Sequence, residues 1–177
     1  MIRPATPSDF AAIHTVINDG ASAYKGIIPA DRWHEPYMSE SDLHAEIDDG
    51  VVFSCFVEGE EILGVMGVQD KGPVILIRHA YVRSSARRRG IGAELLSALS
   101  RMTSKPILIG TWKAATWAIA FYEKHGFTVL PDGQARALLE EFWNVPVRQM
   151  ETSVVLANEA FTASAISWRG RLSHPPM

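Results

Sequence analysis

Residues 81–96 read Tyr81-Val82-Arg83-Ser84-Ser85-Ala86-Arg87-Arg88-Arg89-Gly90-Ile91-Gly92-Ala93-Glu94-Leu95-Leu96. This stretch predicts the end of a strand, a tight basic loop and the first turns of a helix. A helix start offers backbone N–H groups without partners and a partial positive charge. Gly90 and Gly92 let a ligand approach that backbone closely, and the three arginines add charged donors. The stretch therefore predicts a pyrophosphate-binding loop.

Two common nucleotide-binding motifs do not fit this loop. A P-loop ends in Gly-Lys-Ser or Gly-Lys-Thr, and the sequence contains neither tripeptide. The Rossmann fingerprint needs a glycine three places after Gly92, where Leu95 stands. The loop is therefore expected to bind a phosphate-bearing ligand within a different fold.

Upstream of the loop, the sequence predicts two helices and three strands. Apolar residues at helical spacing predict a helix over residues 7–24, and Ser39 caps a second helix over 39–49. The aromatic-rich residues 25–38 between them are expected to form a long irregular loop, a kind of connection that is often functional. Short turns join the strands expected over residues 51–57, 62–68 and 74–82, which predicts an antiparallel meander.

Downstream of the loop, helices and strands alternate. Helices are expected over residues 90–102 and 115–125, and strands over 107–112 and 127–130. A strand, a helix and a strand in succession indicate a parallel pair with a crossover. A short helix over 135–142 and a final strand over 152–156 complete the list. The expected fold class is α/β with a mixed sheet, an antiparallel meander followed by a parallel strand pair with flanking helices. Residues 1–156 form one domain, and residues 157–177 are expected to be a tail.

Composition excludes several classes of protein. The 177 residues are 47% hydrophobic and 21% charged, which is ordinary for one globular domain. A formal net charge of −3 argues against a broad surface for nucleic acid or an anionic membrane. The N-terminus has no signal-peptide pattern and no segment approaches the ~20 apolar residues of a membrane span, so a cytoplasmic protein is expected. The single cysteine, Cys55, excludes an intramolecular disulfide and is expected to be a buried strand residue.

The basic loop and its surroundings resemble the GNAT superfamily of acyl-CoA-dependent N-acyltransferases. Arg87-Arg88-Arg89-Gly90-Ile91-Gly92 matches the Arg/Gln-x-x-Gly-x-Gly/Ala pyrophosphate loop of that family. Ala80-Tyr81-Val82 precedes it as the family's cofactor strand does, and Ala118-Ile119-Ala120-Phe121-Tyr122-Glu123-Lys124-His125-Gly126-Phe127 follows at the usual distance. The resemblance covers residues 2–156. It implies that strands near residues 80–83 and 107–112 splay apart and hold acetyl-CoA between them.

The same resemblance implies which residues meet acetyl-CoA. The backbone of Tyr81, Val82 and Arg83 would pair with the pantetheine arm and polarise the thioester carbonyl. The pyrophosphate would lie on the loop residues, which are Arg87, Arg88, Arg89, Gly90, Ile91, Gly92 and Ala93. The sequence departs from the family at Ala115, where many members have an asparagine that contacts CoA. That contact is expected either to be missing or to be replaced by Thr116 or a water.

Acyl transfer from a thioester needs few groups and no metal. The amine attacks in its neutral form, so its proton must go to a base or to water. A backbone N–H is sufficient to stabilise the tetrahedral oxyanion. Tyr122 matches the tyrosine that protonates the departing CoA thiolate in many family members, and a core aromatic is the alternative. No His/His or His/Glu pair at helical spacing indicates a metal site.

His79 is the first candidate for the base, because a histidine can accept a proton near neutral pH. Period-two alternation places it on one face of the long strand with Ile75, Ile77 and Tyr81. The alternative is a histidine that is hydrogen-bonded within the sheet. Other candidates, acting directly or through water, are Glu35, Asp31 and His34.

Aromatic residues are the candidates for the acceptor pocket, with packing in the core or loop as the alternative. They are Tyr24, Trp33, Tyr37 and Trp112. An aromatic wall suits an apolar or cationic amine. Trp143 and Trp168 are expected to pack, and His174 to lie in the tail.

The sequence thus predicts an N-acetyltransferase that moves the acetyl group of acetyl-CoA to a primary amine of a small molecule or peptide, by direct attack in a ternary complex. A hydroxyl acceptor is also compatible with the site. The alternatives are a non-catalytic acyl-CoA sensor and a plain interaction domain. The expected partners are acetyl-CoA and the acceptor, with no nucleic acid and no membrane. The final strand and tail offer an interface for a homodimer.

Overall fold

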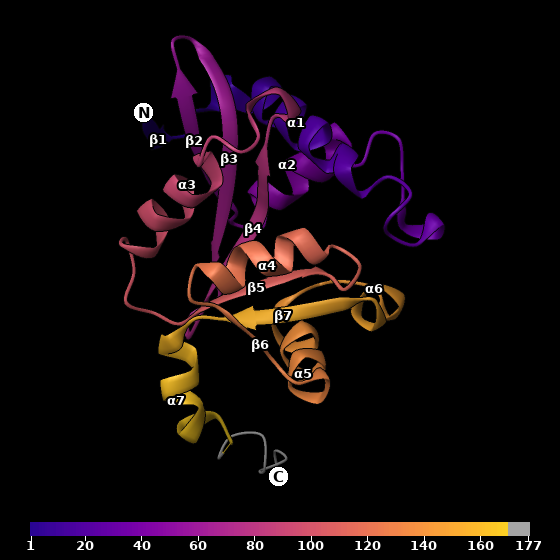
Figure 1. Ribbon diagram of the computed structural model, residues 1–177, viewed down its shortest axis with the longest axis vertical. Helices are drawn as coiled ribbons and strands as arrows, with labels where there is room; N and C mark the ends of the chain where they lie inside the picture. The colour runs from indigo at the N-terminus through magenta and orange to yellow at the C-terminus, as the bar shows by residue number, and fades with distance from the viewer. Residues whose placement is uncertain (170–177) are drawn as a thin grey trace.

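The computed structural model describes residues 1–169 (Figure 1). The N-terminal half contains strand β1 (Ile2–Pro4), the 3-10 turn η1 (Pro7–Asp9), helix α1 (Phe10–Ala21), the turns η2 (Ser22–Tyr24) and η3 (Ala30–Arg32), helix α2 (Glu40–Asp48) and strands β2 (Val52–Glu58), β3 (Glu61–Asp70) and β4 (Ile75–Val82). The helix expected over residues 7–24 is thus α1 flanked by a 3-10 turn at each end.

The C-terminal half begins with the 3-10 turn η4 (Ser84–Ala86) and helix α3 (Ile91–Ser100). It continues with β5 (Ile107–Trp112), α4 (Thr116–Lys124), β6 (Thr128–Val129), α5 (Asp132–Phe142), α6 (Val147–Glu151), β7 (Ser153–Ala157) and α7 (Glu159–Arg169). The bounds of β5 are those expected from the sequence. The five-residue α6 was not among the expected elements.

The strands form one mixed sheet in the order β1-β2-β3-β4-β5-β7-β6. β4 and β5 pair in parallel across the α3 crossover, and every other neighbouring pair is antiparallel. The mixed α/β fold class is therefore confirmed. The parallel pair expected between residues 107–112 and 127–130 is wrong, because β7 lies between these strands. β7 pairs with β5 along one edge and with β6 along the other, all five of its residues are buried, and the two-residue β6 lies at the edge of the sheet.

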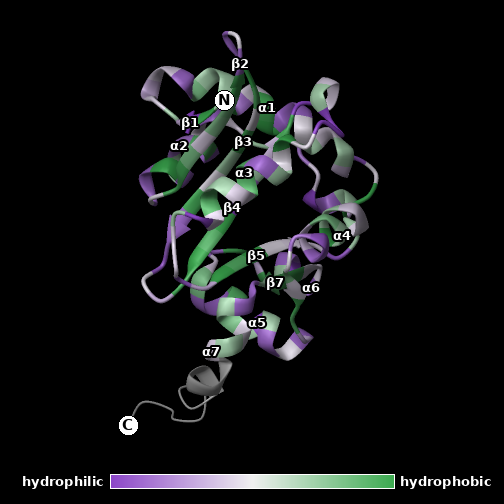
Figure 2. Ribbon diagram, turned by 60° about the vertical axis from the view of Figure 1, so that its left-hand side comes forward, coloured by the Kyte–Doolittle hydropathy of each residue, from purple (hydrophilic) through white to green (hydrophobic). Residues whose placement is uncertain are grey.

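Helices cover both faces of the sheet. On one face, α3 and α4 pack over a core that includes Leu95, Ile77 and Ile109. On the other face, α1 and α2 cover β2–β4, whereas α5 and α7 cover β5 and β7. Figure 2 shows hydrophobic residues concentrated on the central strands, whereas the helices carry both hydrophobic and hydrophilic residues.

Several single-residue expectations can be followed in this core. Cys55 is fully buried in β2, and Trp143 packs beside α5. The tail expected from residue 157 begins instead with α7, whose Phe161 is fully buried. The side chain of Trp168 and all of His174 lie outside the described residues. Within residues 1–169, no helix is long and apolar enough to cross a membrane.

Candidate functional site

The parallel strands β4 and β5 separate soon after they meet. They pair only between Ile75–Ile77 and Ile107–Ile109, and residues beyond these three pairs do not pair with one another. The end of β4 and the end of β5 therefore diverge. A strand edge without a partner presents free backbone N–H and C=O groups. The splay that the resemblance implies is present at the expected strands.

A β-bulge at His79 changes the direction of the side chains at the divergence. Gly67 faces Arg78 and Val65 faces Tyr81, so His79 and Ala80 together oppose one residue of β3. His79 has a φ of 49°, in the left-handed region that non-glycine residues rarely adopt. Such an extra residue moves the following side chains to the other face.

The shared face expected for His79, Tyr81, Ile75 and Ile77 is wrong for this reason. Ile75 and Ile77 lie in the core under α3, where Ala80 and Val82 also pack. Tyr81 packs against the core on the α1 side, which contains Phe53. The His79 ring lies 6.3 Å from that Phe53 ring, between centroids.

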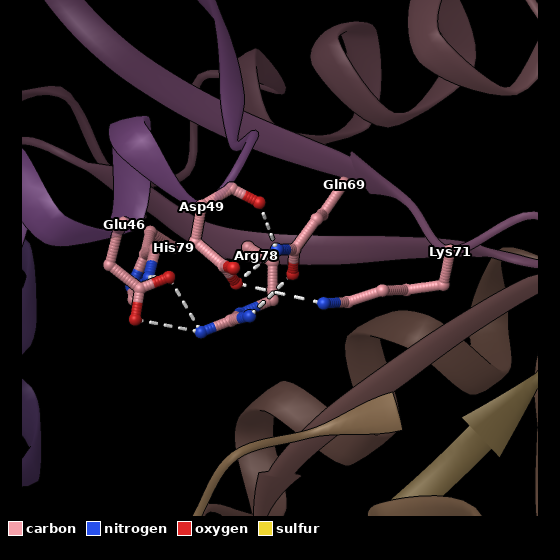
Figure 3. Close-up of polar contacts among 6 residues, drawn as sticks. All are labelled: Glu46, Asp49, Gln69, Lys71, Arg78 and His79. Atoms are coloured by element: carbon pink, nitrogen blue, oxygen red, sulfur yellow. Dashed lines mark hydrogen bonds and ion pairs between the residues drawn. The ribbon is translucent and has the colours of Figure 1, made fainter. Parts of the chain in front are cut away.

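The imidazole of His79 belongs to a polar network between α2 and the bulge (Figure 3). Its Nε2 lies 3.1 Å from Oε2 of Glu46 but is not aligned for a hydrogen bond. Nη2 of Arg78 donates to both carboxylate oxygens of Glu46, at 2.8 and 2.7 Å. Burial acts to raise the pKa of Glu46, but His79 and Arg78 outweigh it and the pKa is lowered.

The network extends along β3. Nη1 of Arg78 donates to Oε1 of Gln69 at 2.8 Å, and Nε2 of Gln69 donates to the backbone and side-chain oxygens of Asp49. Lys71 lies 3.6 Å from the same carboxylate. The end of α2 is thereby tied to β3 and β4 at the bulge (Figure 3).

A cavity of about 860 Å³ opens where β4 and β5 diverge. It is bounded by β4, the basic loop, the start of α3, the end of β5, one side of α4 and the segment after α1. The expected site residues that line it are Tyr24, His79, Tyr81, Val82, Arg87, Arg88, Gly90, Ile91, Gly92, Ala93 and Tyr122. The structure therefore brings the catalytic candidates and most of the expected CoA-binding residues to one cavity.

The basic loop has the backbone that a phosphate group requires. Gly90 precedes α3 with a φ of 80°, a left-handed conformation that glycine adopts at little cost, and no atom lies within 4 Å of a Cβ placed there. Arg88 also has a positive φ, of 64°. The start of α3, where the first N–H groups of a helix have no partner within the helix, thus lines the cavity beside Arg87 and Arg88.

The end of α1 packs directly against this site. A Cβ on Gly20 would lie 2.9 Å from the Cβ of Tyr81, so only glycine fits there. The carboxylate of Asp19 accepts hydrogen bonds from the backbone N–H and hydroxyl of Ser84, and Arg87 donates to the Gly20 carbonyl at 3.2 Å. The segment that leads to Tyr24 is therefore joined to the basic loop.

Three expected CoA contacts do not line the cavity. The Arg83 N–H donates to the Leu63 carbonyl on β3 at 2.8 Å, and its guanidinium donates to the Ile62 carbonyl. Arg89 forms an ion pair with Glu58 on the outside of the loop. Thr116 is an exposed first residue of α4.

Tyr122 is both a core residue and a cavity residue. Its ring packs edge-on against Phe121 and Phe127, and only 7% of the residue is exposed. Burial, and to a smaller extent the neighbouring Tyr24, raises the pKa of its phenol. The hydroxyl therefore stays protonated at neutral pH.

The other expected acceptor residues form an aromatic group behind Tyr24. Trp33, Tyr37 and Trp112 pack in one cluster with Ile28, and the Trp112 indole donates to the Tyr37 hydroxyl at 3.3 Å. They do not line the cavity themselves. They support Tyr24, whose ring lies 5.8 Å from that of Tyr37.

The alternative bases lie outside the cavity. Glu35 accepts from Lys25 at 3.2 Å and from the Trp33 indole at 3.1 Å, and these contacts lower its pKa. Asp31 accepts from Arg148 at 3.3 Å, and that hydrogen bond likewise lowers its pKa. His34 is exposed on the same loop. Among residues 1–169, no cluster of three or more His, Cys, Asp or Glu side chains could hold a metal ion.

Apart from Tyr122, sequence reasoning missed one wall of the cavity, which α4 and the adjoining His125 supply. Its members are Trp117, Ala118, Phe121, Tyr122, Lys124 and His125. These positions recur at helical spacing, so they form one stripe along the helix. That spacing was the signal that could have identified Trp117.

A family model described as an acetyltransferase (GNAT) domain matches residues 18–141. The chain belongs to the GNAT acetyltransferase family. The matched range includes the end of α1, the β2–β4 meander, the basic loop and α4. Every cavity residue lies within it.

Solved GNAT structures have the same fold at low sequence identity. The PaiA N-acetyltransferase of Thermoplasma acidophilum, in complex with coenzyme A, is 16% identical, with a TM-score of 0.67 over 89% of this chain and 97% of that one. The ribosomal-protein-S18-alanine N-acetyltransferase of Escherichia coli is 15% identical, with a TM-score of 0.63 over 89% and 92% of the two chains. A GNAT family acetyltransferase from Elizabethkingia anophelis, with acetyl-CoA bound, is 18% identical, with a TM-score of 0.58 over 90% and 97%.

Proposed function

We propose that this GNAT protein transfers the acetyl group of acetyl-CoA to a primary amine, by direct attack in a ternary complex. The observation that carries the proposal is the divergence of β4 and β5 directly beside a basic loop at a helix start. One cavity thereby joins a phosphate-binding end to a free strand edge. Acetyl-CoA carries both matching parts, a pyrophosphate and an extended arm with two amide groups.

The pyrophosphate would bind the N–H groups of the first turn of α3. A phosphate there interacts favourably with the positive end of the helix, and the guanidinium groups of Arg87 and Arg88 add charge. Gly92 leaves a wider space in front of the Phe121 ring, because a Cβ at that position would contact the ring at 3.4 Å. Two of the similar structures contain coenzyme A or acetyl-CoA, which supports this assignment.

The backbone of β4 would hold the arm and the reacting carbonyl. Since the Arg83 N–H donates to β3, strand alternation turns the Val82 N–H to the opposite edge, toward β5. β5 is no longer paired with β4 at this level. We assign the Val82 N–H as the donor that stabilises the oxyanion when the amine attacks the thioester carbon.

Two proton transfers complete the reaction. Collapse of the tetrahedral intermediate breaks the C–S bond, and the CoA thiolate takes a proton from the Tyr122 hydroxyl in our proposal. The attacking nitrogen loses a proton to His79 or to water. Nε2 of His79 lies 3.1 Å from Oε2 of Glu46, so we assign the other ring nitrogen, Nδ1, as the proton acceptor.

A thermal-shift titration followed by a turnover assay tests the proposal. Acetyl-CoA and CoA at ~100 times the dissociation constant should add about 2.7 kcal/mol of stability, whereas ATP and NAD should not. Release of free thiol on addition of an amine would then demonstrate transfer. No shift at millimolar acetyl-CoA contradicts the proposal, and binding without turnover across a broad amine panel favours a non-catalytic acyl-CoA sensor.

A further inference from the structure

Aromatic rings from three separate segments converge at one end of the cavity. Tyr24 comes from η2, Tyr81 from β4 and Trp117 from α4, and all three line the cavity wall. The Tyr24 ring centroid lies 6.2 Å from that of Tyr81 and 5.8 Å from that of Trp117. Tyr37 completes the group from behind, 6.4 Å from Tyr81. We call Tyr24, Tyr81 and Trp117 the aromatic wall.

The aromatic wall meets α4 near the start of the helix, whereas the cationic residues of α4 that line the cavity lie at its end. Along α4, Trp117 precedes Lys124 by seven residues, which is about 10 Å of helix. Lys124 and His125 mark the other end of that helix, and Arg87 and Arg88 add the positive charge of the loop. A ligand whose phosphates lie on the cationic side would therefore leave the aromatic wall free for a second molecule.

The exposure of Trp117 is the feature of this wall that indicates a ligand-binding site. It is 44% exposed, although it is a large apolar side chain at the rim of a cavity. Ile27, another cavity residue, is 47% exposed. An apolar ligand that binds in a concave site would bury the exposed apolar groups at its rim, and this burial favours binding.

The charge at this end favours an apolar body over a polycation. Burial, followed by the influence of Tyr37, raises the pKa of Tyr24 to about 12, and burial also raises the pKa values of Tyr37 and Tyr81. All three phenols are therefore neutral. The carboxylates of the adjoining loop already have cationic partners, Glu35 in Lys25 and Asp31 in Arg148.

We propose that the acceptor is a primary amine joined to an aromatic ring by a short linker. The ring lies against the aromatic wall, with the hydroxyl groups of Tyr24 and Thr111 as polar contacts at its edge. The amine extends toward the strand divergence, where the thioester carbon is expected. This inference depends on the proposed acetyl transfer, and it names the class of acceptor for the same site.

Three amines and the full-length chain test this inference. The probes are 2-phenylethylamine, ethylamine, which lacks the ring, and spermidine, which is a polycation. With acetyl-CoA saturating, kcat/KM for 2-phenylethylamine should exceed both other values at least tenfold. Equal or faster turnover of ethylamine or spermidine overturns the aromatic acceptor and leaves acetyl transfer intact. Saturation-transfer NMR of the CoA-bound protein gives a second readout, and absence of both turnover and binding of 2-phenylethylamine overturns the inference.

A variant pair then assigns the preference to the wall. Trp117→Ala should lower the ratio of kcat/KM between 2-phenylethylamine and ethylamine about tenfold, whereas Trp117→Phe should keep it within about threefold. A purely structural effect would reduce both amines together and leave the ratio unchanged. Val147→Ala is the matched control, because Val147 is a 54% exposed apolar residue that does not line the cavity. An unchanged ratio in Trp117→Ala contradicts the proposal.

Discussion

Glu46 and Arg78 form an ion pair in which one guanidinium nitrogen donates to both carboxylate oxygens, at 2.8 and 2.7 Å. Their side chains are only 25% and 14% exposed, so the pair is shielded from water. Arg78 immediately precedes the bulge residue His79, and Glu46 contacts both. The Glu46 carboxylate of α2 therefore stabilises β4 at its bulge.

We predict that Glu46→Gln lowers the free energy of unfolding by about 1–3 kcal/mol, because it leaves a shielded guanidinium without its countercharge. Urea denaturation measures the change. Asp48→Asn on the same helix is the control, since Asp48 is exposed and forms no ion pair with any of residues 1–169. A loss in Glu46→Gln no larger than in that control would contradict the role of the pair.

Stability should fall in acid partly through Asp9. Arg3 donates to its two oxygens at 2.7 and 3.0 Å and the Thr6 N–H donates at 2.7 Å, and these bonds hold the pKa of Asp9 far below its usual 3.8. A lowered folded-state pKa stabilises the fold above the unfolded pKa and loses that effect as pH falls below it. We expect Asp9→Asn to cost about 1–3 kcal/mol at pH 7 and progressively less below pH ~4. A difference between wild type and variant that stays constant from pH 7 to pH 2 would exclude this linkage.

Tyr122→Phe should reduce kcat at least ~10-fold with little change in the Kd of acetyl-CoA, because it removes only the proposed proton donor. Since burial raises the pKa of the phenol above its usual 10, the wild-type rate should show no loss of this donor up to pH ~9. Steady-state kinetics across pH measure both effects. An unchanged kcat would remove Tyr122 from the mechanism.

The arginines of the loop should divide into two classes. Arg87→Ala and Arg88→Ala are each expected to weaken CoA binding about three- to tenfold at low salt, and less at high salt because ions screen the interaction. Arg89→Ala is the matched control, because Arg89 pairs with Glu58 away from the cavity. Calorimetric titration at two salt concentrations measures the effect. Equal losses in all three variants would mean that general charge, rather than position, sets the affinity.

Local sequence signals were enough to predict most of the fold. The turns at Gly59 and Gly72 marked the meander, and the glycines and arginines of residues 87–92 marked the binding loop. These signals depend on backbone preferences and periodicity, which are local properties. They predicted both ends of β5 correctly. The two catalytic candidates that they suggested, His79 and Tyr122, both line the cavity.

The features that were not predicted depend on contacts between distant segments. The bulge at His79 exists because β4 carries one more residue than β3 at that level, a matter of register that β4 alone does not encode. The insertion of β7 between β5 and β6 likewise depends on pairing across the chain. The backbone of Arg83 and the side chain of Arg89 were expected to contact CoA, although the Arg83 N–H donates to Leu63 on β3 and Arg89 pairs with Glu58.

The short zone of pairing between β4 and β5 divides the sheet into two halves that share few backbone hydrogen bonds. One half contains β1–β4 and the other β5–β7, and three residue pairs of β4 and β5 join the two halves within the sheet. A pantetheine arm bound between the diverging ends of β4 and β5 would act as an extra strand that is hydrogen-bonded to both halves. Amide exchange at the ends of β4 and β5 should therefore slow when CoA binds. The cosubstrate would then serve as a part of the sheet during every turnover, while the core that β3, β4, β5 and β7 share holds the two halves together after each release.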